Sequence, residues 1–276
     1  MNMTPAITLN SGASIPQLGF GVFQVDPAST KAVVLNALEV GYRHLDTAAG
    51  YDNETAVGEA IAESGITRED LFITTKQRPA DQASEASKVA IDSSLDKLGL
   101  SFVDLYLIHW PTPARGLYVG SWQALERFAE QGLTRSIGVS NFLPEHLDRL
   151  AAESGTIPAV NQIELHPELQ QRDVEERSVR AGIRIEAWSP IARGALVSTP
   201  EVDAIAAKYD KTVAQVTLRW HIEHGRIIIP RTVHKKRMIE NFALFDFALE
   251  PGEIAALDAL DAGKRVGPDP ATNNNI

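Results

Sequence analysis

The feature of this 276-residue chain that most constrains its fold is a repeat of short apolar segments, each followed by a helical pattern. Seven of these segments end in a polar or aromatic residue that could do chemistry, and they read RHLDTAAGY, DLFITTK, VDLYLIHW, TRSIGVSN, AVNQIELH, IRIEAW and RIIIPRT. A run that is apolar on both faces is typical of a parallel strand buried on both sides. Reactive groups in parallel α/β folds gather at the carboxyl ends of the strands, so the pattern predicts one active site on one face of the fold.

Helical patterns follow the predicted strands, and a glycine stands near the expected end of each of the first six helices. These helices are predicted over residues 30–39, 54–63, 83–98, 122–130, 145–152 and 174–180, with Gly41, Gly65, Gly99, Gly132, Gly155 and Gly182 as their stops. A loop, SPIARGALVST, follows Trp188, and the last strand is predicted over 226–229. Further helices are predicted over 201–208, 213–223, 235–243 and 252–260, before an irregular tail.

A closed barrel and an open doubly wound sheet are the two ways to build such a repeat. Counting residues 18–20 as a first strand gives eight strands, and the chain length suits a (β/α)8 TIM barrel. Open sheets that bind dinucleotides carry G-x-G-x-x-G after the first strand, whereas the nearest segment here, GFGVFQ at 19–24, lacks the third glycine. We therefore predict one (β/α)8-barrel domain over residues 1–276, with an N-terminal β-hairpin formed by ITL and SIP and an extra C-terminal helix.

Composition excludes several classes of function. The absence of cysteine removes disulfides, thiolate zinc sites and a cysteine nucleophile. A net charge of −10 argues against a nucleic-acid partner. No apolar run reaches the ~18 residues that span a bilayer, and the first residues do not resemble a secretory signal. We expect a cytoplasmic monomer that acts on a small molecule. His221 and His224 do not form the H-E-x-x-H pattern, so no metal site is expected.

Four residues at the ends of neighbouring predicted strands form a candidate reacting centre: Asp46, Tyr51, Lys76 and His109. Tyrosine titrates near ~10, and a nearby ammonium group stabilises its phenolate. Asp46 can hold that ammonium group charged and in place, and His109 can donate a hydrogen bond to a substrate oxygen. This group of side chains favours carbonyl reduction, in which a proton donor stands beside the arrival point of a hydride.

The segments GYRHLDTAAGYDNE, LFITTK, LYLIHWP, GVSNF, NQIELHP and IPRTVHKKRMIEN together resemble the aldo-keto reductase family, in order and over almost the whole chain. Within it, the chain resembles the short bacterial branch that includes 2,5-diketo-gluconate reductases. The resemblance implies NADPH-dependent reduction of aldehydes, ketones or dicarbonyls in a bacterial protein. It also implies that Tyr51 is the general acid, that Lys76 and Asp46 tune it, and that His109 orients the carbonyl.

The resemblance further implies that NADPH lies extended across the top of the barrel. At the nicotinamide end, the carboxamide would be held by Ser140, Asn141 and Gln162, and Trp188 would stack on the ring. The pyrophosphate would be covered by Ser189 and Ile191. At the adenosine end, the 2′-phosphate would be surrounded by Arg231, Thr232, Val233, His234 and Arg237, and the adenine would be held by Glu240 and Asn241. Independently, cations crowd the start of the predicted helix after Thr232, where a bound anion would be stabilised. His234 stands where close relatives can have Arg, which leaves NADH possible but weaker, and Ala192 replaces a glycine of the usual S-P-L-G loop.

The substrate pocket implied by the resemblance is lined by Phe23, Ala48, Gln77, Arg78 and Trp110, next to the catalytic residues. Many relatives have Leu-Trp after the catalytic lysine, so the Gln77-Arg78 pair predicts a wider and more polar pocket. Two alternatives stay open. The chain could be a non-catalytic NADPH-binding sensor of the same fold, or a metal-independent barrel enzyme of another type, such as an isomerase or a lyase.

Overall fold

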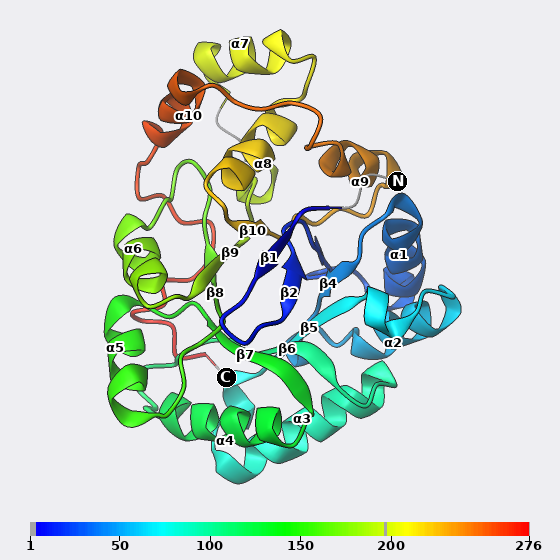
Figure 1. Cartoon of the computed structure of the whole chain (residues 1–276), viewed down its shortest axis with the longest axis vertical. Helices are drawn as coiled ribbons and strands as arrows, with labels where there is room; N and C mark the ends of the chain where they lie inside the picture. Colours follow the sequence, from blue (N-terminus) through cyan, green and yellow to red (C-terminus); the bar gives the residue numbers. More distant parts are fainter. Residues whose placement is uncertain (1–3, 196–197, 276) are drawn as a thin grey trace.

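The computed structural model describes residues 4–195 and 198–275, so residues 196 and 197 of the predicted SPIARGALVST loop lie outside the described part. Eight parallel strands follow one another around a single sheet in chain order. They are β3 (Phe20–Gly21), β4 (His44–Asp46), β5 (Phe72–Gln77), β6 (Val103–Ile108), β7 (Thr134–Ser140), β8 (Val160–Glu164), β9 (Arg184–Trp188) and β10 (Ile227–Ile228). Leu18 forms a parallel bridge with Ile228, so the two ends of the sheet meet and the predicted barrel is confirmed (Figure 1).

The helices surround the strands, and each strand is followed by the helix that packs outside it (Figure 1). The ring consists of α1 (Pro27–Val40), α2 (Glu54–Glu63), α3 (Ser84–Leu98), α4 (Tyr118–Glu130), α5 (Pro144–Glu153), α6 (Arg172–Arg180), α8 (Val213–Glu223) and α9 (Lys235–Phe242). Two additional helices, α7 (Pro200–Lys208) and α10 (Pro251–Asp258), contact each other beside α8. The predicted extra C-terminal helix is therefore present.

Helix boundaries differ from the predicted ones where a cap sets them. Helix α1 begins three residues early because Asp26 accepts a hydrogen bond from Ala28 N at 2.8 Å and Pro27 occupies the first turn. Five of the six predicted stop glycines have positive φ, which glycine adopts without steric cost. Gly155 is the exception, because α5 ends at Glu153 with Ser154 in an extended conformation.

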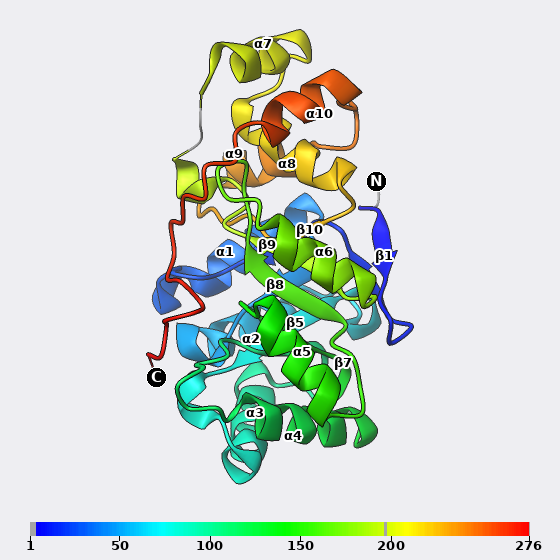
Figure 2. The same cartoon turned by 90° about the vertical axis from the view of Figure 1, so that its left-hand side faces the viewer.

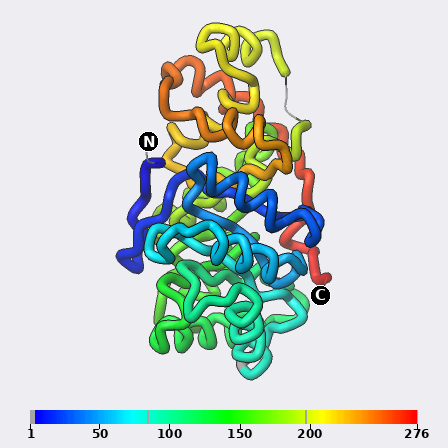
Figure 3. Tube along the Cα trace, turned by 90° about the vertical axis from the view of Figure 1, so that its right-hand side faces the viewer, coloured from blue at the N-terminus to red at the C-terminus, as the bar shows by residue number. Residues whose placement is uncertain are grey.

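The predicted N-terminal hairpin closes one end of the barrel. Strands β1 (Ala6–Thr8) and β2 (Ser14–Pro16) pair antiparallel, with Ile7 opposite Ile15. Leu9 and Ile15 pack with Phe72, Leu105, Leu107, Ala159, Val160 and Ile227 of the barrel strands in one buried cluster. Figures 2 and 3 show the hairpin and the C-terminal tail on opposite sides of the barrel, so the other end is left for a site.

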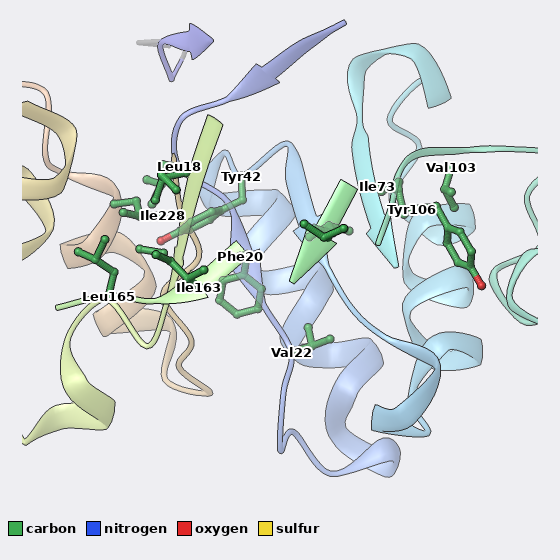
Figure 4. Packing of buried hydrophobic residues seen from close by; sticks show 14 of the residues in the cluster. Leu18, Phe20, Val22, Tyr42, Ile73, Val103, Tyr106, Ile163, Leu165 and Ile228 are labelled. Atoms are coloured by element: carbon green, nitrogen blue, oxygen red, sulfur yellow. The ribbon is translucent and has the colours of Figure 1, made fainter. Parts of the chain in front are cut away.

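The main hydrophobic core lies between the strands and the helices. Leu18, Phe20, Tyr42 and Ile228 come together where the sheet closes (Figure 4). Tyr42 packs edge-on against Phe20 with ring centroids 5.3 Å apart. Alternate residues of a strand face opposite sides, so each strand contributes to this outer core and to the barrel interior. The interior at the hairpin end contains the apolar side chains of Leu105, Leu107 and Val160, whereas polar side chains are buried at the carboxyl ends of the strands.

Candidate active site

A buried layer of polar side chains fills the barrel interior at the carboxyl ends of the strands. Lys76 Nζ lies 2.6 Å from Oδ1 of Asp46 and donates to the carbonyl oxygen of Thr47 at 2.8 Å. Gln162 Nε2 donates to Oδ2 of Asp46 and to Oε2 of Glu186, both at 2.8 Å. These side chains come from β4, β5, β8 and β9, so the closed barrel brings together residues far apart in the sequence.

Tyr51 is held directly above this layer by the short helix η1 (Ala49–Tyr51). Its hydroxyl lies 3.4 Å from Lys76 Nζ. Its ring packs against the His109 ring, with centroids 5.6 Å apart, and against the Phe23 ring, with centroids 5.0 Å apart. The structure therefore brings Asp46, Tyr51, Lys76 and His109 together as predicted from their places at the strand ends.

Burial and the neighbouring charges decide the ionisation of this group. Burial raises the pKa of Tyr51 more than the Lys76 ammonium lowers it, so the net shift is upward and the phenol keeps its proton at neutral pH. Burial alone would lower the pKa of Lys76, but Asp46 and Tyr51 outweigh it and the lysine stays charged. Burial, with a smaller effect of Lys76, lowers the pKa of His109 to about 3. A neutral His109 still has one N–H to donate.

The buried histidines make the stability depend on pH. Burial lowers the pKa of His44 to about 3, whereas an unfolded histidine titrates near 6.5. Between pH 6.5 and pH 3, the unfolded chain binds a proton on His44 that the folded chain does not bind. The free energy of unfolding therefore decreases as the pH falls below about 6.5. Burial raises the pKa of Glu186 to about 8. The folded chain therefore binds the extra proton on Glu186, and this group increases the free energy of unfolding as the pH falls from 8 to 4.5.

We expect His44→Gln to lose less unfolding free energy than the wild type between pH 7 and pH 5, because it lacks this titrating group. Urea denaturation at the two pH values measures the difference. Val89→Ala, at an exposed site on α3, is the control that should follow the wild type. Equal losses in His44→Gln and the wild type would contradict the assignment.

A cavity of about 940 Å³ opens above the polar layer. Asp46, Tyr51 and His109 line it, whereas Lys76 is fully buried behind them. Each residue that we predicted to bind the cofactor also lines it: Ser140, Asn141, Gln162, Trp188, Ser189, Ile191, Arg231, Thr232, Val233, His234, Arg237, Glu240 and Asn241. The arrangement gives one continuous space from the reacting centre to the start of α9.

The predicted substrate residues are only partly brought together. Phe23, Arg78 and Trp110 line the cavity. Gln77 does not, because side chains alternate along β5 and its neighbour Lys76 takes the inward direction. The Gln77 amide is buried and donates to Asp81 O and to Ser87 Oγ instead. Ala48 is also fully buried outside the lining, so the structure does not place these two predicted substrate residues at the cavity.

Arg78 reaches the cavity but is already paired. Its Nε lies 2.9 Å from Oδ2 of Asp81 and its Nη2 lies 3.3 Å from Oδ1. The Asp81 carboxylate thus compensates the charge of the Arg78 guanidinium.

A hydrogen-bond network fixes the ring of Trp188 beside the reacting centre. Trp188 Nε1 donates to Oδ1 of Asn141 at 2.9 Å. Asn141 Nδ2 in turn donates to the backbone oxygen of His109 and to Oγ of Ser140, both at 3.0 Å. Asn141 adopts a left-handed backbone with φ of 64°, which asparagine tolerates. The Trp188 indole is thus connected through Asn141 to the backbone of His109, which directly follows β6.

The far end of the cavity carries an uncompensated cation. Lys235 is paired with Glu39 at 2.7 Å, and Arg231 Nη2 donates to Gln24 O at 2.5 Å. Among residues 4–195 and 198–275, Arg237 has no hydrogen-bond or ion-pair partner, although it stands in the first turn of α9 and lines the cavity. An anion bound here would meet both this guanidinium and the positive end of the helix.

The loop after β9 contributes a lining residue that sequence reasoning missed. The Arg193 guanidinium lies 6.0 Å from the centre of the Phe23 ring and lines the cavity. The backbone is left-handed at Ser189, Ala192 and Arg193, with φ of 49°, 47° and 56°. Ala192 therefore occupies a conformation that the glycine of the usual loop would adopt without strain. The sequence shows that Ala192 stands where the usual loop has glycine, but it does not show that the backbone there is left-handed.

The C-terminal tail, which the sequence indicated only as an irregular segment of unspecified conformation, also reaches the cavity. The buried carboxylate of Glu164 accepts hydrogen bonds from Val266 N at 2.5 Å and Gly267 N at 3.1 Å. A Cβ at Gly267 would collide with the ring of Trp188. Beyond this anchor, Pro268, Asn273 and Asn275 line the cavity. The sequence feature that could have indicated this contact is Glu164, because a carboxyl group in a buried strand needs hydrogen-bond donors.

Among residues 4–195 and 198–275, no group of three or more His, Asp or Glu side chains is placed to hold a metal ion. Within the same residues, every helix falls short of the length and apolar character that a membrane span requires.

Known proteins are similar to this chain in both sequence and fold. Residues 17–262 match a model of the Aldo/keto reductase family. The chain is 50% identical to an aldo-keto reductase of Mycolicibacterium smegmatis over 99% of each chain. It is 48% identical to the methylglyoxal reductase DkgA of Yersinia pestis over 98% of each chain. A crystal structure of a Gox0644 mutant in complex with NADPH matches with a TM-score of 0.94, at 40% identity over 99% of each chain.

Proposed function

Because this chain belongs to the aldo/keto reductase family, we propose that it reduces aldehydes, ketones or dicarbonyls to alcohols with NADPH, and that Tyr51 is the general acid. The observation that carries the proposal is the contact of the Tyr51 hydroxyl with the buried Lys76–Asp46 pair, beside His109 and inside the cavity. The matching structures in complex with NADPH and the similarity to a methylglyoxal reductase support the cofactor and the dicarbonyl class.

The residues present fit such a cofactor. Trp188 offers a flat aromatic face, and flat rings stack on one another. Gln162 lines the same cavity, and Arg237, which has no partner among the described residues, stands at its other end. We propose that Gln162, with Ser140 and Asn141 around it, receives the nicotinamide carboxamide, that Ser189 and Ile191 cover the pyrophosphate, and that Arg237 with Thr232 receives the 2′-phosphate. When bound, NADPH supplies the hydride.

The chain's own part in the reaction is to hold the carbonyl and to supply a proton. A neutral His109 donates one hydrogen bond to the carbonyl oxygen and orients it. Tyr51 then gives its proton to that oxygen as the carbon accepts the hydride, which leaves a phenolate on Tyr51. Lys76 stabilises this phenolate from 3.4 Å, and Asp46 keeps Lys76 charged. Solvent returns a proton to Tyr51 after the alcohol leaves.

The proposal is tested by following the loss of NADPH absorbance with methylglyoxal and a panel of aldehydes. NADPH carrying deuterium at C4, as the 4R and 4S forms in turn, should transfer the label from one form only, to the carbinol carbon of the product. NADPH binding without turnover of any substrate would favour a sensor of the same fold. No NADPH binding would overturn the proposal and favour another class of barrel enzyme, such as an isomerase or a lyase.

Arg237 should decide the preference for NADPH. We expect Arg237→Ala to weaken NADPH binding by roughly 10- to 100-fold, the usual value of a charged hydrogen bond, and to leave NADH binding almost unchanged. His234→Arg should move the preference the other way. Fluorescence titration with each cofactor measures both. Lys236→Ala is the matched control, because the Lys236 side chain is 90% exposed and lies outside the cavity lining. Equal weakening of NADH and NADPH in Arg237→Ala would contradict the assignment.

A further inference from the structure

Glu186 is a carboxyl group in a place where barrels usually have aliphatic side chains. It lies in the middle of β9 with none of its surface exposed. Barrel interiors are normally filled by layers of branched apolar residues. Burying a carboxyl group costs free energy unless it is hydrogen-bonded. The carboxyl group at this position therefore indicates a role that a hydrophobic side chain of similar size could not perform.

The partner of Glu186 is Gln162, and the strand register puts the two side by side. Gln162 is directly opposite Glu186 in the parallel pairing of β8 with β9. Gln162 Nε2 donates to Glu186 Oε2 at 2.8 Å, and the same nitrogen donates to Asp46 Oδ2 at 2.8 Å. Asp46 comes from β4, on the opposite side of the eight-stranded barrel. Two carboxyl groups thus approach one amide nitrogen from different directions.

This arrangement uses both N–H groups of the Gln162 amide. An amide nitrogen has two hydrogens, and its carbonyl oxygen can only accept. A flipped amide would turn its oxygen toward two carboxyl groups and lose both bonds. In the described part of the chain, no donor reaches Oε1 of Gln162, and Gln162 lines the cavity. What Gln162 offers to a ligand is therefore an acceptor.

We propose that Glu186 is a positioning residue, which together with Asp46 locks the Gln162 amide so that only its carbonyl oxygen faces the cofactor. The lock selects a nicotinamide whose carboxamide N–H can donate to that oxygen. The inference rests on the proposed use of NADPH and adds the residue that sets the polarity of the carboxamide site.

The surroundings of Glu186 are compatible with this role in its protonated form. Burial, with the nearby charge of Asp46, raises the pKa of Glu186 to about 8. Its Oε2 accepts from Gln162, while Oε1 receives no hydrogen bond from the described residues and lies 3.6 Å from Nε2 of His44. The other ionisable groups around it are Asp46, Lys76 and Tyr51. A protonated Glu186 still accepts through Oε2, so Glu186→Gln should preserve the lock.

The test compares the dissociation constants of NADP⁺ and of its 3-acetylpyridine analogue, in which a methyl group replaces the carboxamide NH₂. Isothermal titration of the full chain measures both, without turnover. The wild type should prefer NADP⁺ by roughly fivefold or more, the usual value of one hydrogen bond. Glu186→Met should bring the ratio closer to one, because Asp46 then holds the Gln162 amide by one N–H only and the other N–H can turn toward the acetyl oxygen. Glu186→Gln should keep the wild-type ratio.

Glu186→Thr is a second variant in case Glu186→Met fails to fold, and thermal melting checks each protein. A lower affinity for both cofactors with an unchanged ratio would overturn the inference, because it would show a structural role only. Loss of the ratio in Glu186→Gln would also overturn it. If the wild type bound neither cofactor, the proposed function itself would fail. A wild type that binds NADP⁺ without preferring it over the analogue would overturn the inference alone.

Discussion

Tyr51→Phe is expected to lower kcat/KM for carbonyl reduction by about 100- to 10,000-fold, the usual contribution of a general acid. The substitution removes only the hydroxyl that lies 3.4 Å from Lys76 Nζ, while the ring keeps its packing against Phe23 and His109. Binding of NADPH should therefore stay close to that of the wild type. The rate of NADPH oxidation with methylglyoxal and a fluorescence titration of the cofactor measure the two quantities.

Tyr106→Phe is the matched control. The Tyr106 hydroxyl is buried on the outer side of β6 without a hydrogen-bond partner in the described residues, so its removal should leave the activity unchanged. If Tyr51→Phe kept a third or more of the wild-type activity, Tyr51 would not be the acid. His109 would then be the next residue to test.

Lys76→Met is expected to destabilise the fold as well as abolish most activity. Lys76 has no exposed surface, and its removal leaves the buried Asp46 carboxylate without its counter-ion. Breaking a buried ion pair in this way costs about 3–5 kcal/mol of unfolding free energy. The activity falls because no cation then stabilises the Tyr51 phenolate. Urea denaturation and the NADPH assay measure the two losses separately.

The double variant Lys76→Met with Asp46→Asn separates stability from catalysis. Removing both charges should restore most of the lost stability, because no unpaired charge remains buried. The activity should stay as low as in Lys76→Met. Lys31→Met is the control at the surface, where the pair with Glu63 at 2.8 Å is exposed to solvent and its loss should change the stability little. Recovery of activity in the double variant would exclude Lys76 as the group that stabilises the phenolate.

The reacting centre was predictable because the parallel strands carry its residues on their carboxyl ends. Asp46 ends β4, Lys76 is one residue from the end of β5, and His109 follows β6. Strands of this kind leave their ends on one face of the barrel, so chain order alone brings these side chains near each other. Strand alternation was harder to apply at the end of β5, where Gln77 was placed in the pocket but points outward.

The surroundings of the site depended on contacts between distant parts of the chain. Glu186 was read only as part of an apolar strand, because nothing near it in sequence shows that Gln162 and Asp46 meet it inside the barrel. The path of the tail depends likewise on Glu164, about a hundred residues earlier, since an irregular segment has no periodic pattern of its own. Its place over the cavity therefore came from the structure.

The sequence by itself determined the eight-fold alternation of strand and helix, the closed barrel, and the face on which the reacting centre lies. These features follow from local patterns of apolar residues, caps and glycines that repeat along the chain. Only the tertiary structure decided the net upward shift of the Tyr51 pKa, the two hydrogen bonds from the Gln162 amide and the pairing of Arg78 with Asp81. Each of these depends on burial and on distances of a few ångströms between side chains, which are set when the barrel closes.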